Sequence, residues 1–379
     1  MRISMWSDSF YPYVSGVTRS LADTRESLKA LGHDVLIFAP NYPGAPDEED
    51  VFRFPSVPAP TNPGFYLTLP FAPGLGQYLD RRRPDVVHIH SPFTTGRLGI
   101  RVAKKLDLPV IFTYHTMYAL YTHYSPVAGN FLKNIVASYT VAVANRADLV
   151  IAPSTAVREY LLDWGVRKPV EVLPSGIKFQ DFAGRDPEYL RRNGLVPPDR
   201  PLVLTAGRLA KEKNLEVLLE AFAAMKVKDA VLVLAGDGPM RRDLESKAEA
   251  LGVQDRVFFL GKVPPSVMPD VYASGDVFVF TSMTETQGLV IAEAKAAGLP
   301  IVAVDALGVT DAVKHEEDGF LLPNNALAIA SALDLLLSDH ERRRRMSSRA
   351  RENAKAFSMD RIARELLRIY EKLVAGTAF

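Results

Sequence analysis

The sequence predicts an α/β protein with two halves, each a parallel sheet covered by helices on both faces. The chain has 379 residues, which is long for one hydrophobic core and sufficient for two. Short runs rich in Val, Ile, Leu and Phe alternate with longer stretches of helical periodicity, as parallel sheets require. This alternation stops at a turn-rich stretch, residues 174–198, and then begins again.

In the first half, strands are predicted where short apolar, mostly β-branched or aromatic runs occur. These runs lie at residues 2–6, 34–39, 85–90, 109–114, 149–152 and 170–173. Amphipathic stretches predict helices at residues 17–31, 95–106, 129–147 and 155–165. Gly32 is suited to ending the first helix.

The second half repeats the plan. Strands are predicted at residues 202–205, 230–234, 257–260, 276–280, 300–304 and 320–322. Helices are predicted at residues 214–225, 240–251, 266–274 and 289–297, and a final one at 360–374. Asn214 is expected to cap the helix that it begins.

Composition excludes several classes of function. The hydrophobic fraction is 47%, the charged fraction 23% and the net charge +1, so no basic excess points to nucleic acid. The absence of cysteine excludes disulfides and thiolate metal sites and fits a reducing cytosol. No uninterrupted apolar run is long enough to span a membrane, and the first ten residues do not resemble a signal peptide. Attachment to a membrane surface stays open.

The stretch 276–298 contains two carboxylates in unusual places. Glu285 follows a predicted strand, and Glu293 lies inside a helix whose other residues are built for burial. An unpaired buried carboxylate costs several kcal/mol, so Glu293 needs a hydroxyl or cationic partner. The carboxyl end of a strand beside a helix N-terminus, opened here by Gly288, favours a phosphate-bearing ligand.

Arg208 and Lys213 follow the predicted strand 202–205 and lie at the carboxyl end of the sheet. There they can bracket a diphosphate, Arg through two hydrogen bonds and Lys as a point charge. The alternative is a solvated loop with Glu212 as an internal partner.

Taken together, Gly207-Arg208…Glu212-Lys213-Asn214 and the acids Glu285 and Glu293 resemble the donor-site motifs of family-4 retaining glycosyltransferases. The resemblance implies the GT-B fold, in which two Rossmann-like domains face each other across a cleft. It covers nearly the whole chain. The domains implied are residues 1–175 with the crossing helix 360–379, which bind the acceptor, and residues 176–359, which bind the donor.

The resemblance assigns roles to these residues. Arg208 and Lys213 stabilise the leaving diphosphate, and Glu285 contacts the donor sugar. Backbone groups of the segment Gln287, Gly288 and Leu289 contact sugar and diphosphate, and Glu293 holds the ribose. His115, which follows the strand 109–114, contacts the sugar near the anomeric carbon; a hydrogen-bonded boundary residue is the alternative.

Four further residues are expected to contact the donor because of their positions in the chain. Gly236 follows the strand 230–234, where a glycine can serve a ligand or simply a tight turn. Lys262 and Val263 lie where related enzymes hold the base through backbone groups. Gly16, before the first helix, corresponds to a glycine loop that closes on the diphosphate, although many relatives have two glycines there.

His88 and His90 alternate along the strand 85–90 and share one face of the sheet. Such a pair suggests a metal, but without a clear third ligand we predict no metal site. The resemblance likewise implies no cofactor, only a nucleotide diphosphate sugar, expected to be a UDP-sugar, as co-substrate.

The acceptor side contains aromatic residues and a basic run. Phe65 and Tyr66 precede Arg81, Arg82 and Arg83, a combination suited to an anionic bilayer. Tyr118 and Tyr121 follow His115, and this run, like the variant Glu285-Thr-Gln-Gly-Leu, is similar to the diacylglycerol glucosyltransferase branch of the family. The alternative is that the aromatic residues pack the first domain and the arginines cap a helix.

The expected function is therefore transfer of a hexose from UDP-glucose or UDP-galactose to diacylglycerol or a related lipid. The expected location is the cytoplasm, peripheral to the inner face of the cell membrane. The alternatives are a soluble polyol or sugar acceptor, a UDP-sugar epimerase or phosphorylase of the same fold, and a non-catalytic binding protein. A dinucleotide oxidoreductase would need the full glycine fingerprint, which is missing.

Overall fold

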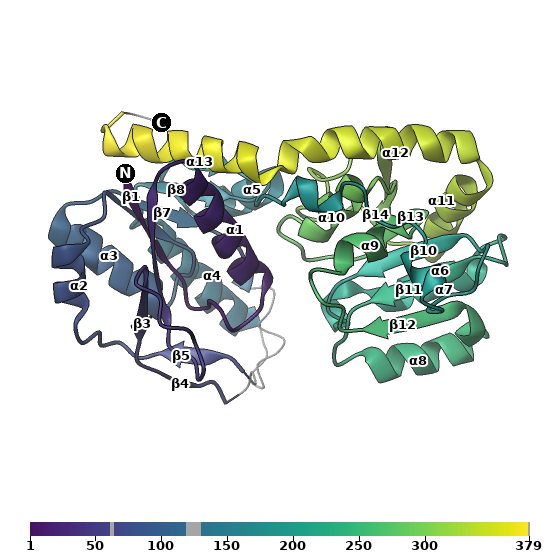
Figure 1. Ribbon diagram of the computed structural model, residues 1–379, viewed down its shortest axis with the longest axis horizontal. Helices are drawn as coiled ribbons and strands as arrows, with labels where there is room; N and C mark the ends of the chain where they lie inside the picture. The colour runs from purple at the N-terminus through teal and green to yellow at the C-terminus, as the bar shows by residue number, and fades with distance from the viewer. Residues whose placement is uncertain (61–63, 119–129, 378–379) are drawn as a thin grey trace. The chain divides into compact units, whose positions relative to one another are not determined.

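A computed structural model describes residues 1–60, 64–118 and 130–377, with the side chains of 130–133 excluded. The chain forms two compact units, one of Met1–Gly176 with Met359–Phe379 and one of Ile177–Ser358. Each unit is a parallel sheet with helices on both faces, which confirms the predicted fold class (Figure 1). The two are called unit 1 and unit 2 below.

The sheet of unit 1 has the order β3-β2-β1-β6-β7-β8-β9, and all its pairs are parallel. The strands are β1 (Arg2–Trp6), β2 (Asp34–Pro40), β3 (Val51–Phe54), β6 (Val86–Ile89), β7 (Val110–Thr113), β8 (Leu149–Ala152) and β9 (Val170–Val172). Strand order reverses between β1 and β6. Ligands of open α/β sheets bind outside the carboxyl ends of strands at such a reversal.

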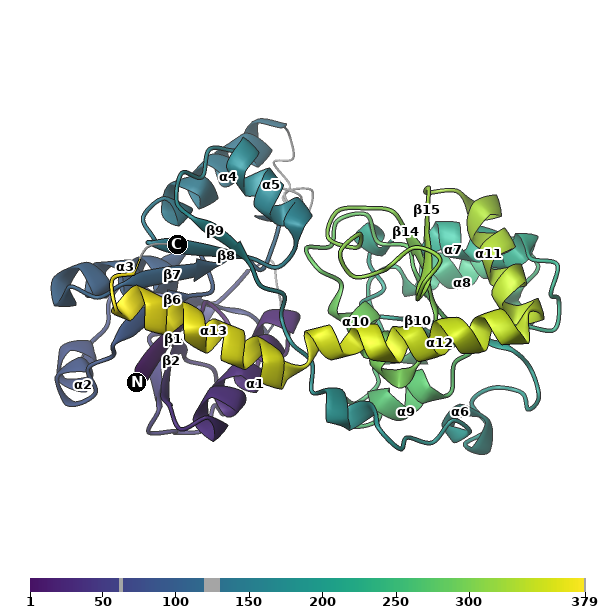
Figure 2. The same ribbon diagram turned by 90° about the horizontal axis from the view of Figure 1, so that it is seen from above.

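The helices of unit 1 are α1 (Gly16–Ala30), α2 (Leu75–Arg81), α3 (Thr94–Leu106), α4 (Asn130–Ala144), α5 (Thr155–Asp163) and α13 (Met359–Val374). The chain returns to this unit through α13, which packs beside α1 and over β1, β2 and β6 (Figure 2). Its apolar stripe includes Ala363, Leu366 and Tyr370, which join the core of Ile3, Leu21 and Ile37.

The sheet of unit 2 has the order β12-β11-β10-β13-β14-β15, again entirely parallel. The strands are β10 (Leu202–Ala206), β11 (Val231–Ala235), β12 (Val257–Gly261), β13 (Val277–Phe280), β14 (Ile301–Val304) and β15 (Gly319–Leu322). Order reverses between β10 and β13. The predicted cations follow the first of these strands and Glu285 follows the second, so the topology brings them to one place.

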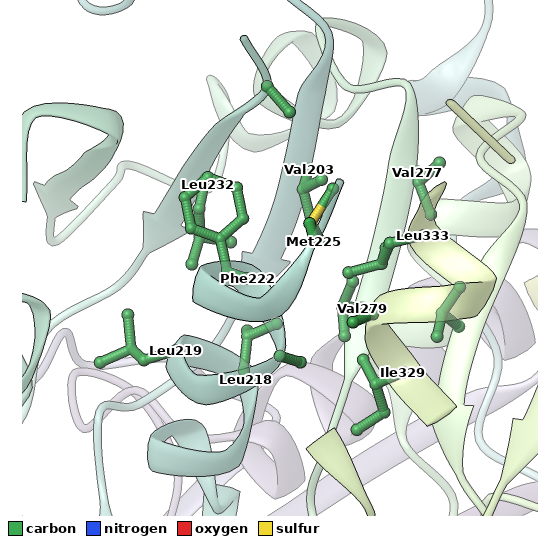
Figure 3. Packing of buried hydrophobic residues seen from close by; sticks show 14 of the residues in the cluster. Val203, Leu218, Leu219, Phe222, Met225, Leu232, Val277, Val279, Ile329 and Leu333 are labelled. Atoms are coloured by element: carbon green, nitrogen blue, oxygen red, sulfur yellow. The ribbon is translucent and has the colours of Figure 1, made fainter. Parts of the chain in front are cut away.

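The helices of unit 2 are α6 (Tyr189–Arg192), α7 (Leu215–Ala224), α8 (Arg241–Ala250), α9 (Met268–Ala273), α10 (Leu289–Ala297), α11 (Ala326–Ser338) and α12 (His340–Ala354). Helices α7 and α11 cover one face of the sheet (Figure 3). Phe222 and Leu218 of α7 and Leu333 of α11 pack against Val203, Leu232 and Val279. This core holds the strands whose carboxyl ends carry the site.

Most predicted strands and helices agree with the structure to within two or three residues, and the differences have physical causes. Strand β3 and the hairpin of β4 (Ser56–Pro58) with β5 (Tyr66–Thr68) are short and are bounded by prolines such as Pro55 and Pro58, so no strand was predicted there. Asn214 precedes α7 but does not cap it through its side chain. Its φ is 54°, and its amide bonds Asn324 instead. In the part of the chain that the structure describes, no helix is long and apolar enough to cross a membrane.

Candidate active site

The loop after β10 brings two predicted cations into one pocket. Arg208 and Lys213 line it together with residues of β13 and the loop after it, including Phe280 and Ser282. Lys213 forms an ion pair with Glu285, and the two side chains are only 20% and 18% exposed. The ammonium of Lys213 also lies 5.8 Å from the ring centre of Phe280. The site therefore holds a partly desolvated charge pair, which is stronger than a pair in water.

Hydrogen bonds tie the loop after β10 to the loop after β13. The hydroxyl of Thr281 donates to the carbonyl of Lys213 (2.8 Å), and that of Ser282 donates to the carbonyl of Glu212 (3.0 Å). Ser282 also reaches the carboxylate of Glu285 at 3.4 Å. These hydrogen bonds fix the loop that carries Lys213 to the loop that carries Glu285.

Gly308, in the loop after β14, supports Glu285 and was missed by sequence reasoning. Its φ is +65°, and a Cβ there would lie 2.4 Å from the carbonyl oxygen of Glu285. Only glycine allows this approach. The signal available in the sequence was a glycine soon after a predicted strand, at the same edge of the sheet as Glu285.

The start of α10 presents backbone N–H groups at this edge. Gly288 has a φ of 71° and precedes Leu289, the first residue of the helix. The free N–H groups of a helix N-terminus favour an anion. Gln287, just before, is 6% exposed.

Glu293 points into the buried side of α10 and is 7% exposed. The hydroxyl of Tyr272 donates to its Oε2 at 2.8 Å. The expectation that this carboxylate has a hydroxyl or cationic partner is confirmed. Its contact with a ribose stays a prediction.

The structure gives Gly236 a packing role. A Cβ there would lie 1.9 Å from the carbonyl oxygen of Gly207, because the loops after β10 and β11 touch through their backbones. Lys262 is exposed and Val263 partly buried, immediately after β12. Backbone packing against Gly207 thus accounts for a glycine at position 236, and its contact with a donor stays a prediction.

In unit 1, Gly16 is the first residue of α1, which Ser15 caps by accepting a hydrogen bond from the N–H of Thr18. A Cβ on Gly16 would meet no described atom within 4 Å. Packing within the described residues therefore does not require this glycine. Close approach of a ligand to the helix N-terminus stays the expectation.

Asp8, which sequence reasoning missed, lies at the strand-order reversal of unit 1. It follows β1, its N–H bonds the Ser91 hydroxyl after β6 (3.0 Å), and its Oδ1 accepts from the N–H of Thr95 (3.1 Å). Its Oδ2 is buried without a described partner. Burial raises the pKa of Asp8 above its ordinary value, although the Thr95 N–H opposes this. Its place after the first strand was the available signal.

Tyr118 lies close to Asp8. Burial, with a smaller contribution from the charge of Asp8, raises the pKa of the Tyr118 phenol. The ring packs edge-on against Phe93, which is 40% exposed. Tyr118 is therefore placed beside the reversal point, and its contact with an acceptor stays a prediction. Tyr121 lies outside the described residues.

His115 follows β7 and is hydrogen-bonded to His90, with 2.9 Å between His115 Nε2 and His90 Nδ1. His88 bonds Tyr370 and Thr113 through its two ring nitrogens. Burial lowers the pKa of His115 to about 4 and that of His88 to about 3. Among the described residues, no group of three or more His, Asp or Glu side chains is arranged to hold a metal ion.

The remaining predicted acceptor residues contact two separate sets of neighbours. Phe65 packs against Tyr13, and Tyr66 packs against Tyr42, both edge-on. Arg82, in contrast, forms ion pairs with Glu49 and Asp50. Arg81 ends α2 and donates to the carbonyl of Gln77 (3.3 Å); Arg83 donates to the carbonyl of Leu106 (2.9 Å). Arg81 and Arg83 thus contact helix carbonyls, as the helix-capping alternative predicts, whereas Arg82 pairs with carboxylates.

Comparison with known proteins agrees with this geometry. The family described as Glycosyltransferase Family 4 matches residues 14–181, and the family described as Glycosyl transferases group 1 matches residues 187–353. The alpha-monoglucosyldiacylglycerol synthase of Streptococcus pneumoniae is 36% identical in an alignment of length 323 that covers 80% of this chain and 71% of that protein. The GDP-mannose-dependent alpha-mannosyltransferase of Mycobacterium tuberculosis is 31% identical in an alignment, gaps included, of length 392 that covers 98% of this chain and 96% of that protein.

Two solved structures share the fold. Sucrose-phosphate synthase from Thermosynechococcus elongatus has a TM-score of 0.81 at 23% identity, covering 99% of this chain and 100% of that chain. Anabaena Alr3699/HepE, solved in complex with UDP, has a TM-score of 0.79 at 22% identity, covering 98% and 100%. With Arg208, Lys213 and Glu285 gathered at the strand-order reversal of unit 2, the chain belongs to glycosyltransferase family 4 and is a retaining GT-B enzyme that uses a nucleotide sugar.

Proposed function

We propose that this enzyme transfers a hexose from a UDP-sugar, UDP-glucose or UDP-galactose, to a hydroxyl of diacylglycerol or a related membrane lipid. The similarity to an alpha-monoglucosyldiacylglycerol synthase supports the lipid acceptor. The observation that carries the proposal is the pocket lined by Arg208 and Lys213 at the strand-order reversal of unit 2, with Glu285 paired to Lys213.

The proposed mechanism assigns leaving-group stabilisation to the two cations. As the bond from the anomeric carbon to the diphosphate breaks, negative charge grows on the diphosphate, and Arg208 and Lys213 stabilise it without a metal. Glu285, positioned by its contact with Lys213, holds sugar hydroxyls. The departing diphosphate oxygen takes the acceptor proton while the acceptor attacks the same face, which retains the configuration.

We assign the remaining donor contacts from the positions of the residues in the chain and at the ends of the strands. The N–H groups of Gly288 and Leu289, beside Gln287, bind diphosphate and sugar. Glu293 holds the ribose and Lys262 and Val263 hold the base through their backbones. Gly16 and Gly236 let backbone approach the phosphates. His115 contacts the sugar.

On the acceptor side, we place the lipid near Tyr118 and the aromatic group of Phe65 and Tyr66. Val57 and Leu67 are paired across the β4–β5 hairpin and are 42% and 47% exposed. An exposed apolar pair with a basic run nearby in sequence suits peripheral attachment to an anionic membrane on the cytoplasmic side. Because Arg82 is committed to ion pairs, Arg81 and Arg83 are the arginines with more freedom to face lipid headgroups.

A second candidate is transfer of mannose from GDP-mannose, since the mannosyltransferase relative matches 98% of this chain. A soluble polyol or sugar acceptor and UDP-sugar epimerisation are the further alternatives. Each predicts a different product from the same donor pocket, so one assay separates them.

The test is incubation with UDP-glucose, UDP-galactose or GDP-mannose and diacylglycerol in mixed micelles, with chelator present, following nucleotide release and glycolipid. Glycolipid from a UDP-sugar is the expected result. Mannolipid formed from GDP-mannose alone would show that the donor is GDP-mannose rather than a UDP-sugar. UDP release without glycolipid would indicate a soluble acceptor in place of the lipid. Activity lost on chelation would contradict a metal-independent reaction.

A further inference from the structure

His90 makes a contact with the predicted sugar-binding His115 that no motif assigns. It follows β6, while His115 follows the neighbouring β7. His90 Nδ1 and His115 Nε2 are 2.9 Å apart, and the rings are inclined by only 19°. His90 is 4% exposed. A buried ring at this distance fixes both the position and the plane of the ring that it bonds.

His90 is itself held by packing on His88. The two ring centres are 3.9 Å apart. His88 cannot turn easily, because its Nδ1 lies 2.6 Å from the Tyr370 hydroxyl of α13 and its Nε2 lies 2.6 Å from the Thr113 hydroxyl. His90 therefore packs on the ring of His88, whose two nitrogens are both hydrogen-bonded.

The three rings are neutral near pH 7. Burial lowers the pKa of His88 and His115 to about 3 and about 4, and it lowers that of His90 as well, with His88 and His115 adding to the effect. A neutral imidazole has one N–H and one bare nitrogen. In the bond between His90 and His115, one ring must donate and the other accept.

The environment of His90 Nε2 decides the direction. This nitrogen is buried without a hydrogen-bond partner among the described residues. A buried N–H without a partner is rarer than an under-satisfied acceptor, so the bare nitrogen is assigned to Nε2 and the proton to Nδ1. His90 Nδ1–H then donates to His115 Nε2, and His115 carries its own proton on Nδ1.

We propose that His90 is a positioning residue for sugar transfer: by donating from Nδ1, it orients His115 and fixes the tautomer with the proton on Nδ1. His115 then offers Nδ1–H as a donor to a hydroxyl oxygen of the transferred sugar. This role rests on the proposed function, in which His115 contacts that sugar.

A matched pair of variants tests the hydrogen bond. His90→Asn places an amide near the position of Nδ1 and keeps the donor, whereas His90→Gln places its amide near Nε2 and loses the bond. His90→Phe keeps the ring and removes both nitrogens. We expect His90→Gln and His90→Phe to lower kcat/KM for the sugar donor by about 10–100-fold, the usual effect of losing an orienting partner. His90→Asn should recover most of this loss, and UDP affinity should change in none of them.

Equal losses in His90→Asn and His90→Gln would contradict the proposal, since a general packing defect would cause that result. A double-mutant cycle adds a second criterion. His90→Phe should cost nothing further in a His115→Ala background if His90 acts through His115, and full additivity would overturn the role.

The tautomer can be read without any substrate. Heteronuclear NMR of the imidazole nitrogens in the full-length protein should show His115 protonated at Nδ1 in the wild type and at a mixture of nitrogens in His90→Phe. A wild-type His115 protonated at Nε2 would overturn the assignment. An enzyme that transfers no sugar from any UDP-sugar but shows the expected tautomer would contradict the proposed function and leave the His90–His115 geometry intact.

Discussion

At the residue scale, Lys213 and Glu285 compensate each other's charge in a largely buried ion pair. Both side chains are about four-fifths buried, so each would be costly to hold there without the other. A bound sugar diphosphate would offer Lys213 a phosphate and Glu285 a hydroxyl. After this exchange Lys213 would have an anionic partner and Glu285 a hydrogen-bond donor, so neither charge would lack a partner.

We predict that Lys213→Met and Glu285→Ala each lower turnover by at least about 100-fold, the effect typical of losing one transition-state partner. The cause would be loss of charge stabilisation on the diphosphate or of sugar positioning. UDP-sugar turnover is the measurement. Lys211→Met, in the same turn but exposed, is the matched control and should keep its turnover. Near-normal turnover in Lys213→Met or Glu285→Ala would refute the assignment of this pocket.

Asp8 gives unit 1 a pH-dependent stability. Because its pKa is raised on folding, the folded protein binds this proton more tightly than the unfolded chain. The stabilising contribution is complete below the ordinary carboxyl pKa and is lost as the pH rises through the higher folded value. Asp8 therefore makes the folded protein less stable at high pH than below the ordinary carboxyl pKa.

We expect Asp8→Asn to raise the melting temperature at pH 7.5 and to change it little at pH 4, with about 2–4 °C for each kcal/mol in a domain of this size. Asn retains the oxygen that accepts from Thr95 and removes the charge. Calorimetry at the two pH values is the measurement, and the exposed Asp163→Asn in α5 is the control. An equal decrease at both pH values would contradict this account, because the loss would not depend on the charge of Asp8. Slower transfer by a more stable Asp8→Asn would indicate that the carboxylate serves the acceptor.

At the scale of elements, α10 depends on a buried ion pair one turn from the site. Lys295 and Asp318 are 2.6 Å apart and almost completely buried. Burial lowers the pKa of Lys295, although Asp318 opposes this. Lys295 also donates to the carbonyl of Ala312, and Asp318 accepts from Asn353. The pair fixes α10, which carries Glu293, against the loop before β15.

We predict that Lys295→Met destabilises unit 2 by about 3–5 kcal/mol, because it leaves the buried carboxylate of Asp318 without its cation. Adding Asp318→Asn should recover most of this loss, since the pair would then be neutral. Thermal unfolding is the measurement. Lys314→Met removes an exposed partner of Glu317 and should cost less than about 1 kcal/mol. A double variant as unstable as the single one would contradict this account.

The central strands were predictable because their apolar runs are bounded by turn residues. β1 and β8 agree with the prediction residue for residue, and α10 begins and ends as expected at Gly288 and Gly298. Hairpin β4–β5 was not predictable. Its strands have three residues each, and they depend on packing of Tyr66 against Tyr42, which local sequence does not reveal.

The proposed donor pocket was predictable to the extent that its residues follow strands. Arg208, Lys213 and Glu285 were predicted because they follow strands at their carboxyl ends, and strand order then brings them together. The contact of His90 with His115 depends on which strands are neighbours, and Gly308 depends on how two loops cross. Neither can be read from periodicity, because both depend on tertiary pairing.

At the scale of the whole molecule, unit 1 is discontinuous in sequence. The chain leaves it at Gly176 and returns at Met359, and these residues touch: a Cβ on Gly176 would lie 2.8 Å from the Cα of Met359. The returning helix α13 contributes Leu366 to the hydrophobic core and Tyr370 to the hydrogen bond with His88. Unit 2 has its own two-sided core.

We therefore predict that truncation after Ser358 destabilises unit 1 selectively, because it removes Ala363, Leu366 and Tyr370 from that core. Calorimetry should lose or lower one transition while unit 2 unfolds as before and still binds UDP. Leu366→Ala, a milder change, should destabilise unit 1 by about 2–5 kcal/mol. Arg368→Ala, whose side chain is 68% exposed, should stay within about 0.5 kcal/mol of the wild type. If the truncated protein kept both transitions, α13 would be an attachment to unit 1 rather than part of its core, and the link from Tyr370 to the histidines would have no bearing on stability.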